Sequence, residues 1–126
     1  MSITPYLTLS DASAAIEFYK KALGATEKAR MPAEDGKRVM HAELEIAGGR
    51  LFLADDFTNA EKGAVRARQS VFIGLEKAAD VDKITDRAES AGAKVNQQPE
   101  DMFWGDRFAQ FTDPFGHEWM VGAPKG

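Results

Sequence analysis

The feature that most constrains the fold of this chain is a repeat in the spacing of its glycines. The triplet "LGA" at residues 23–25 matches "AGA" at 91–93, and "GKR" at 36–38 matches "GDR" at 105–107. Gly48 and Gly116, which are 68 residues apart, provide a third match at nearly the same offset. Three matches in the same order indicate an internal duplication, so the chain should fold as two copies of one supersecondary unit.

The first half shows a strand, a helix and three further strands. Strands are expected at 3–9, 25–32, 39–47 and 48–56, and a helix is expected at 10–24. Ser10 or Asp11 is the expected N-cap, and Gly24 the expected stop. Residues at helical spacing should form the buried face of this helix: Ala12, Ala15, Ile16, Tyr19, Ala22 and Leu23.

The second half repeats this order. A strand at 70–76 precedes a helix at 78–92 and strands at 93–98, 106–113 and 117–122, and the helix should bury Val81, Ile84, Ala88 and Ala91. The sequence therefore predicts an α+β fold. It consists of two βαβββ modules, residues 1–57 and 68–126, within a single domain spanning 1–126. The polar segment between the halves is the expected linker.

The segment 39–47 alternates with the period of a half-buried strand. One face carries Met40, Ala42, Leu44 and Ile46, and the other carries His41, Glu43 and Glu45. Because the apolar face should pack inward, His41 and Glu43 are candidates for ligand binding. The alternative is a plain polar face, with a histidine that only forms a hydrogen bond in the wall of the sheet.

Two other segments contribute candidate site residues. "DMFWGDRF" brings Phe103 and Trp104 close to Arg107 in a glycine-containing loop, and pocket walls combine aromatic surface with a few polar groups in this way. The alternative is that Trp104 plugs the end of a barrel while Arg107 pairs with Asp106 or a neighbour. "DPFGHEWMVG" places His117 directly after a turn, as a polar margin beside an apolar strand.

The composition narrows the classes of partner. The chain contains no cysteine, which excludes disulfides and thiolate metal sites. A net charge of −4 without a basic run argues against binding to nucleic acid or to anionic membranes. No apolar stretch reaches the roughly 18 residues of a transmembrane helix. We therefore expect a cytoplasmic protein whose partner is a small-molecule ligand.

Two βαβββ modules, with "LSDASAAIEFYKKALGA" near the front and "DPFGHEWMV" near the end, resemble the vicinal-oxygen-chelate superfamily. This superfamily includes glyoxalase I, extradiol dioxygenases and bleomycin-resistance proteins. "VMHAELEI" and "WGDRFAQFTDPFGHEW" are most similar to the PhnB-like branch. The resemblance implies a curved mixed sheet around a small-molecule cleft, and a homodimer in which the cleft is shared.

The resemblance also implies where a divalent metal would bind. The four equivalent positions fall at Thr4, Glu43, Ser70 and Met120, of which only Glu43 is a competent ligand. We therefore expect no conventional metal site and no cofactor. A non-standard set of Glu43 with His41, approached by His117 from the other module, is the alternative.

Three functions follow as hypotheses. The first is a module that binds or sequesters a small molecule, through His41, Glu43, Phe103, Trp104, Arg107 and His117. The second is a metal-dependent lyase or dioxygenase that uses Glu43 with His41. The third is a non-catalytic, homodimeric structural module.

Overall fold

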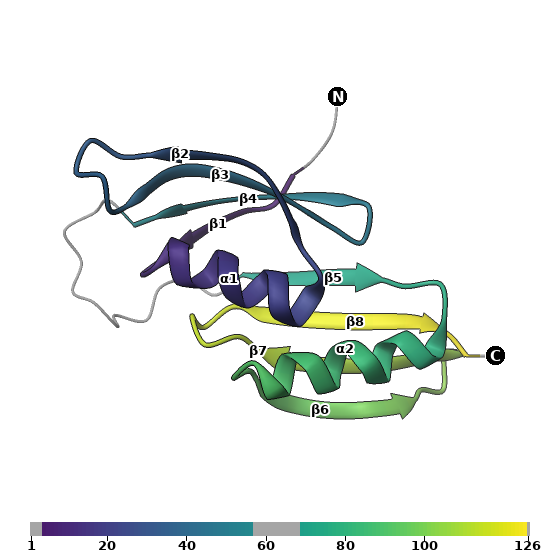
Figure 1. Cartoon of the computed structure of the whole chain (residues 1–126). Helices are drawn as coiled ribbons and strands as arrows, with labels where there is room; N and C mark the ends of the chain where they lie inside the picture. Colours follow the sequence, from purple (N-terminus) through teal and green to yellow (C-terminus); the bar gives the residue numbers. More distant parts are fainter. Residues whose placement is uncertain (1–3, 57–68, 126) are drawn as a thin grey trace.

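The computed structural model describes residues 4–56 and 69–125 and contains two successive βαβββ modules (Figure 1). The first module contains β1 (Tyr6–Leu9), α1 (Ala12–Leu23), β2 (Thr26–Pro32), β3 (Val39–Ile46) and β4 (Gly49–Asp55). The second contains β5 (Ser70–Gly74), α2 (Ala78–Ser90), β6 (Lys94–Asp101), β7 (Asp106–Thr112) and β8 (Glu118–Pro124). The predicted α+β fold is confirmed. The expected module boundaries at 57 and 68 lie outside the described residues.

The two sheets have the same topology. Their strand orders are β1-β4-β3-β2 and β5-β8-β7-β6. In each sheet the first strand pairs in parallel with the last, and the remaining pairs are antiparallel. The duplication seen in the glycine spacing is therefore a duplication of strand order.

Helix α1 forms where the sequence predicts it. Oδ1 of Asp11 accepts a 3.1 Å hydrogen bond from the N–H of Ala14, which caps the first turn. Gly24 ends the helix with a φ of 68°, a conformation that costs glycine little. All six residues of the expected apolar face are buried, and Phe18 is buried with them.

Helix α2 differs from the prediction in its buried face. Val81 and Ala88 are buried as expected, whereas Ile84 is only partly buried and Thr85 is 1% exposed. The buried threonine is tolerated because its hydroxyl donates a 2.7 Å hydrogen bond to the carbonyl oxygen of Val81. Ala91 lies at the C-cap, after the last helical residue.

The β3–β4 hairpin turns through Ala47 and Gly48, with φ values of 50° and 81°. Positive φ at both central positions is the signature of a type I′ turn, which matches the twist of the strands. The sequence predicted a tight turn here, but it placed the turn at the glycine pair. The structure moves it one residue earlier, so that an alanine takes a left-handed conformation.

Met40 is not on the inward face, which corrects the alternation expected for this strand. It is 46% exposed, whereas its neighbour Val39 is 2% exposed. The β2–β3 register explains this, because Met31 pairs with His41 and Pro32 pairs with Val39. Met40 is therefore the extra residue of a β-bulge, which shifts the alternation at the start of the strand.

The two modules pack side by side, with α1 next to α2 (Figure 1). Nη2 of Arg87 in α2 donates a 2.9 Å hydrogen bond to the carbonyl oxygen of Lys21 in α1. The core runs across this junction, since the rings of Tyr19 and Trp119 are 5.1 Å apart. Within the described ranges, no helix is long and apolar enough to cross a membrane.

Candidate ligand-binding site

Each sheet packs one face against its own helix, and no helix of residues 4–56 or 69–125 covers the opposite face, which we call the open face. In β3, Ala42 and Leu44 are fully buried on the helix side, while His41 and Glu43, which alternate with them, are only partly buried. This is the polar face that the alternation predicts. His41 and Glu43 therefore share the open face of the first sheet.

Three rings form an aromatic cluster on this open face. Tyr6, His41 and Phe52 have ring centroids 4.9 to 6.1 Å apart, and Tyr6 is 44% exposed. The Tyr6 hydroxyl lies 3.2 Å from Nδ1 of His41. When the phenol donates this hydrogen bond, the proton of a neutral imidazole sits on Nε2 and can be donated to a ligand.

Glu43 supplies an acceptor beside these rings. It lies opposite Phe52 in the β3–β4 register, and Phe52 in turn lies opposite Tyr6. Its Oε1 atom is 3.4 Å from Nε of Arg50, whose side chain is 71% exposed. An ion pair with a partner as exposed as Arg50 contributes little free energy. Glu43 can therefore give up this contact and bind a ligand at a small cost in free energy.

The second sheet carries an equivalent row. Phe72 lies opposite Met120, and Met120 lies opposite Gln110. The row Tyr6, Phe52, Glu43 of the first sheet is thus matched by the row Phe72, Met120, Gln110 of the second. The first row combines its rings with a phenol hydroxyl and a carboxylate, whereas the second row has a single amide, so only the first contains a charge.

Phe72 covers a glycine. It is 56% exposed, and a Cβ built on Gly122 would lie 3.1 Å from its Cε2 atom. A side chain at Gly122 would therefore displace the ring. The glycine lets the Phe72 ring lie close to β8 while more than half of its surface remains exposed.

Phe103 and Trp104 lie together in the loop between β6 and β7. Their ring centroids are 4.9 Å apart, and Trp104 is 6.0 Å from Phe108. Phe103 is 95% exposed and Trp104 is 50% exposed. Both rings are accessible, and they extend the apolar surface of the second sheet rather than joining His41 and Glu43.

Arg107 belongs to the helix side of the second sheet. Its Nε and Nη2 atoms donate hydrogen bonds of 2.7 and 3.1 Å to the two carboxylate oxygens of Asp82 in α2. Nη1 donates to Asp101 at 3.0 Å, and hydrogen bonds to these two acids raise the pKa of Arg107. The structure therefore places Arg107 with α2, apart from the other predicted site residues.

His117 connects the modules. It is 5% exposed, and its Nε2 atom lies 3.1 Å from the carbonyl oxygen of Thr8 in β1. Because a carbonyl only accepts, Nε2 carries the proton and donates it. Nδ1 is buried and has no hydrogen-bond partner in the described part of the chain. The structure thus places His117 at the junction of the modules rather than on an open face.

The residues at the implied metal positions do not form a donor set. Glu43 lies on β3, the hydroxyl of Ser70 donates to Glu118 at 3.1 Å, and Met120 offers only a thioether. Across residues 4–56 and 69–125, no group of three or more histidine and acidic side chains is arranged to hold a metal ion. A conventional divalent site does not fit these side chains.

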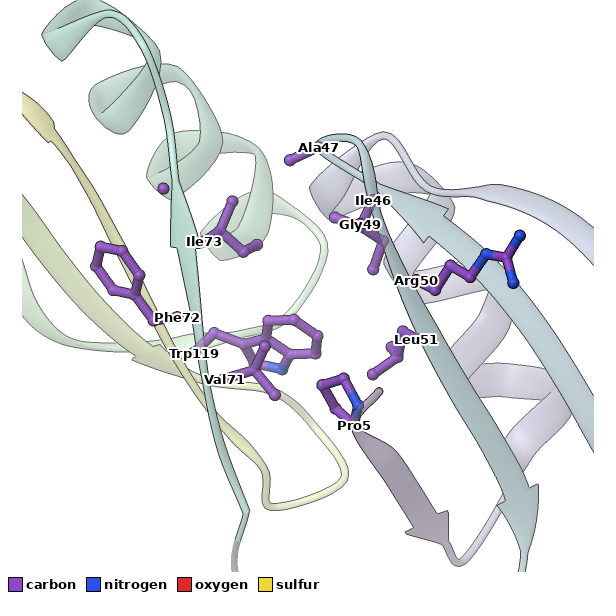
Figure 2. A pocket seen from close by; sticks show the side chains of 11 residues that line it. Pro5, Ile46, Ala47, Gly49, Arg50, Leu51, Val71, Phe72, Ile73 and Trp119 are labelled. Carbon is purple, nitrogen blue, oxygen red and sulfur yellow. The ribbon is translucent and has the colours of Figure 1, made fainter. Parts of the chain in front are cut away.

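A cavity of about 280 Å³ lies between the modules (Figure 2). Its walls are mostly apolar and come from both modules: Pro5, Ile46, Ala47, Gly49, Arg50, Leu51, Val71, Phe72, Ile73, Gly74 and Trp119. None of the six predicted site residues is among them. Sequence patterns indicate Leu51, Val71, Ile73 and Trp119 as core residues, and only the packing of one module on the other reveals that they also surround a cavity.

Comparison with known proteins gives a family match. The model of the Glyoxalase/Bleomycin resistance protein/Dioxygenase superfamily matches residues 3–121. The Mycobacterium tuberculosis protein Rv0887c is 41% identical over 128 residues, which covers 98% of this chain and 74% of that protein.

Solved structures show the same fold. Protein PA1353 from Pseudomonas aeruginosa has a TM-score of 0.79 and 25% identity, covering 100% of this chain and 99% of that one. A Bacillus cereus structure, described as a putative 3-demethylubiquinone-9 3-methyltransferase and PhnB protein, has a TM-score of 0.76 and 16% identity, with both chains fully covered at 100%.

Proposed function

We propose that this chain, which belongs to the Glyoxalase/Bleomycin resistance protein/Dioxygenase superfamily, binds a small and largely aromatic molecule on the open faces of its two sheets. The observation that carries the proposal is the exposure of large apolar side chains on and beside these faces. Tyr6, Phe72 and Trp104 are each 44 to 56% exposed. Apolar surface that gathers in this way marks interaction sites on soluble proteins.

Polar groups among the rings would orient the ligand. His41 offers a ring nitrogen, Glu43 offers a carboxylate, and Gln110 offers an amide on the matching row. A few polar groups within a largely apolar surface is the usual composition of a ligand site. The acceptor at Glu43 favours a ligand that carries a hydrogen-bond donor or a positive charge.

We propose further that a second copy of the chain covers the open faces. One chain leaves the rings of both rows accessible to solvent, and a ligand on a single sheet would keep much of its own surface wet. Apposition of the first sheet of one copy with the second sheet of another would bury both rows around a ligand. The partners in this account are a small molecule and a second copy of the chain.

The proposal needs no metal, because the side chains at the implied positions do not form a donor set. The PhnB-like assignment is part of the same proposal, and it is supported by the segments "VMHAELEI" and "WGDRFAQFTDPFGHEW". A metal-dependent lyase or dioxygenase using Glu43 with His41 is the competing function. Elemental analysis of protein purified without chelators separates the two, because one equivalent of Zn, Ni, Mn or Fe per chain would favour the enzyme.

The experiment that tests binding is a thermal-shift screen with small aromatic compounds, followed by calorimetry on the best hits. Glu43→Gln should weaken hits that carry a donor or a cation, because it removes the negative charge beside the rings. Glu45→Gln is the matched control, since it makes the same change two residues along the strand. Equal affinity in both variants would refute the site. A dimer that binds none of the compounds would support the structural-module hypothesis instead.

A further inference from the structure

We infer that the cavity between the modules is a second binding site, which takes an uncharged aromatic molecule of one or two rings carrying a single hydroxyl or amide group. The inference does not depend on the proposed function, because Phe72 alone is common to the two sites, and Figure 2 shows its ring turned away from the other side chains that line the cavity. It rests on the chemistry of the cavity walls, on the outer edge of β5 and on the direction of the Arg50 side chain.

The walls are apolar and come from the core-facing side of both modules. Leu51 and Ile46 approach from the first module, and Val71, Ile73 and Trp119 approach from the second (Figure 2). Four of these five side chains are less than 9% exposed. The cavity is partly open to solvent, so a ligand can enter it, and an apolar cavity of about 150 Å³ is already large enough for benzene. The volume of about 280 Å³ therefore suits one or two rings.

The edge of β5 supplies the polar contact. β5 is the outermost strand of its sheet, and the carbonyl of Gln69 and the N–H of Leu75 bond to β8. In a parallel pair, alternate residues direct both backbone groups to the same side. Phe72 and Gly74 therefore turn their N–H and C=O groups to the other side, and both residues line the cavity. A hydroxyl or amide on the ligand can use this donor and acceptor pair.

The cavity selects against a charged ligand. Among the described residues of the lining, Arg50 alone is charged, and Figure 2 shows its guanidinium pointing away from the space between the other side chains. Arg50 is also 3.4 Å from Glu43 on the open face. An ionised ligand would give up part of its hydration without gaining a charged partner, which is costly beside apolar walls.

The two tryptophans make the inference testable, because Trp119 lines the cavity and Trp104 lies in the β6–β7 loop. We would titrate ¹⁵N-labelled protein with 2-naphthol and follow the two indole N–H signals, which Trp104→Phe assigns. The Trp119 signal should shift in a saturable way while the Trp104 signal stays in place. A shift of Trp104 alone would place the probe at the open faces and overturn the inference. Failure of both signals to move, up to the solubility of the probe, would also overturn it.

A cavity-filling variant completes the test. Val71→Phe should remove the Trp119 shift at the same probe concentration, because the added ring occupies the cavity. Val95→Phe is the matched control, since Val95 is also a partly buried valine of the second module but does not line the cavity. If Val71→Phe does not fold, Val71→Leu replaces it and should weaken the shift. Binding unchanged by a folded Val71 variant would contradict the inference.

Discussion

The hydroxyl of Tyr19 donates a 2.6 Å hydrogen bond to Oδ2 of Asp113, which lies 94 residues later in the other module. Asp113 is 3% exposed, and it also accepts hydrogen bonds from the indole of Trp119 and the N–H groups of Phe115 and His117. With four donors, this buried carboxylate is fully satisfied. The turn that precedes β8 therefore joins the modules as well as turning the chain.

Removing the phenol should test this junction. Tyr19→Phe leaves the ring in place but removes one donor from Asp113, so we expect the free energy of unfolding to fall by about 1.5–3 kcal/mol, the scale of a hydrogen bond to a charged group. Chemical denaturation measures it. Tyr6→Phe is the control, because its hydroxyl is exposed on the open face, and it should change stability by much less. Equal losses in the two variants would argue against a special role for Asp113.

The same contact predicts a loss of stability in alkali. Burial raises the pKa of Tyr19 well above its ordinary value, and the charge of Asp113 raises it further. The unfolded chain ionises this phenol near pH 10, whereas the folded protein resists ionisation. The stability contribution is thus complete below about pH 10 and is lost as the pH rises toward the folded pKa. Ultraviolet titration of Tyr6→Phe, in which Tyr19 is the only tyrosine, should show ionisation displaced to higher pH and coupled to unfolding.

The β3–β4 turn offers a stabilising change. Ala47 holds a φ of 50°, and a left-handed conformation costs an L-residue about 1–2 kcal/mol. Ala47→Gly should therefore raise the melting temperature, by a net free energy of about 1 kcal/mol or less because glycine is also more flexible when unfolded. Gly48→Ala is the opposite control, since it creates the same strain at the next position and should lower the melting temperature. The account of the turn fails if Ala47→Gly destabilises the protein.

Substitutions of Arg107 and Trp104 should have opposite effects on thermal stability and on ligand affinity. Arg107→Gln breaks the paired contacts with Asp82 and Asp101, so it should lower the melting temperature while affinity per folded molecule for open-face ligands stays unchanged. A large loss of affinity in this variant would show that Arg107 contributes to ligand binding.

Trp104→Ala should have the opposite effect. The side chain is half exposed, so its loss should hardly change stability, but it should weaken ligand binding by about 1–3 kcal/mol. Calorimetry on the two variants measures the difference. If Trp104→Ala binds the ligand with unchanged affinity, the β6–β7 loop does not contribute to the site.

The sequence predicts the fold well because its signals are local. Helical spacing identifies the buried face of α1, alternation puts His41 and Glu43 on one face of β3, and glycine spacing reveals the duplication. Each of these patterns depends on residues close in sequence. Where one extra residue enters a strand, as at Met40, the alternation shifts and a local pattern no longer indicates which face a side chain occupies.

The surroundings of the candidate site residues are harder to predict, because they depend on contacts between residues far apart in the sequence. From the sequence, Arg107 is a cation next to a loop. Its ion pair with Asp82 of α2 joins residues that are 25 positions apart. From the sequence, His117 is a polar residue at the edge of a pocket. Its hydrogen bond to the carbonyl of Thr8 in β1 joins residues that are 109 positions apart. The cavity residues Val71 and Trp119 carry the same apolar signal as the rest of the core. Only the packing of the second module on the first distinguishes them.

The most direct test of the proposed function is a map of backbone amide shifts as ¹⁵N-labelled protein is titrated with the tightest compound from the screen. We predict changes in β1, β3 and β4 around Tyr6, His41 and Phe52, together with changes around Phe72 and Trp104 in the second module. Changes confined to the outer surfaces of α1 and α2, with β3 and β4 unaffected, would contradict the account.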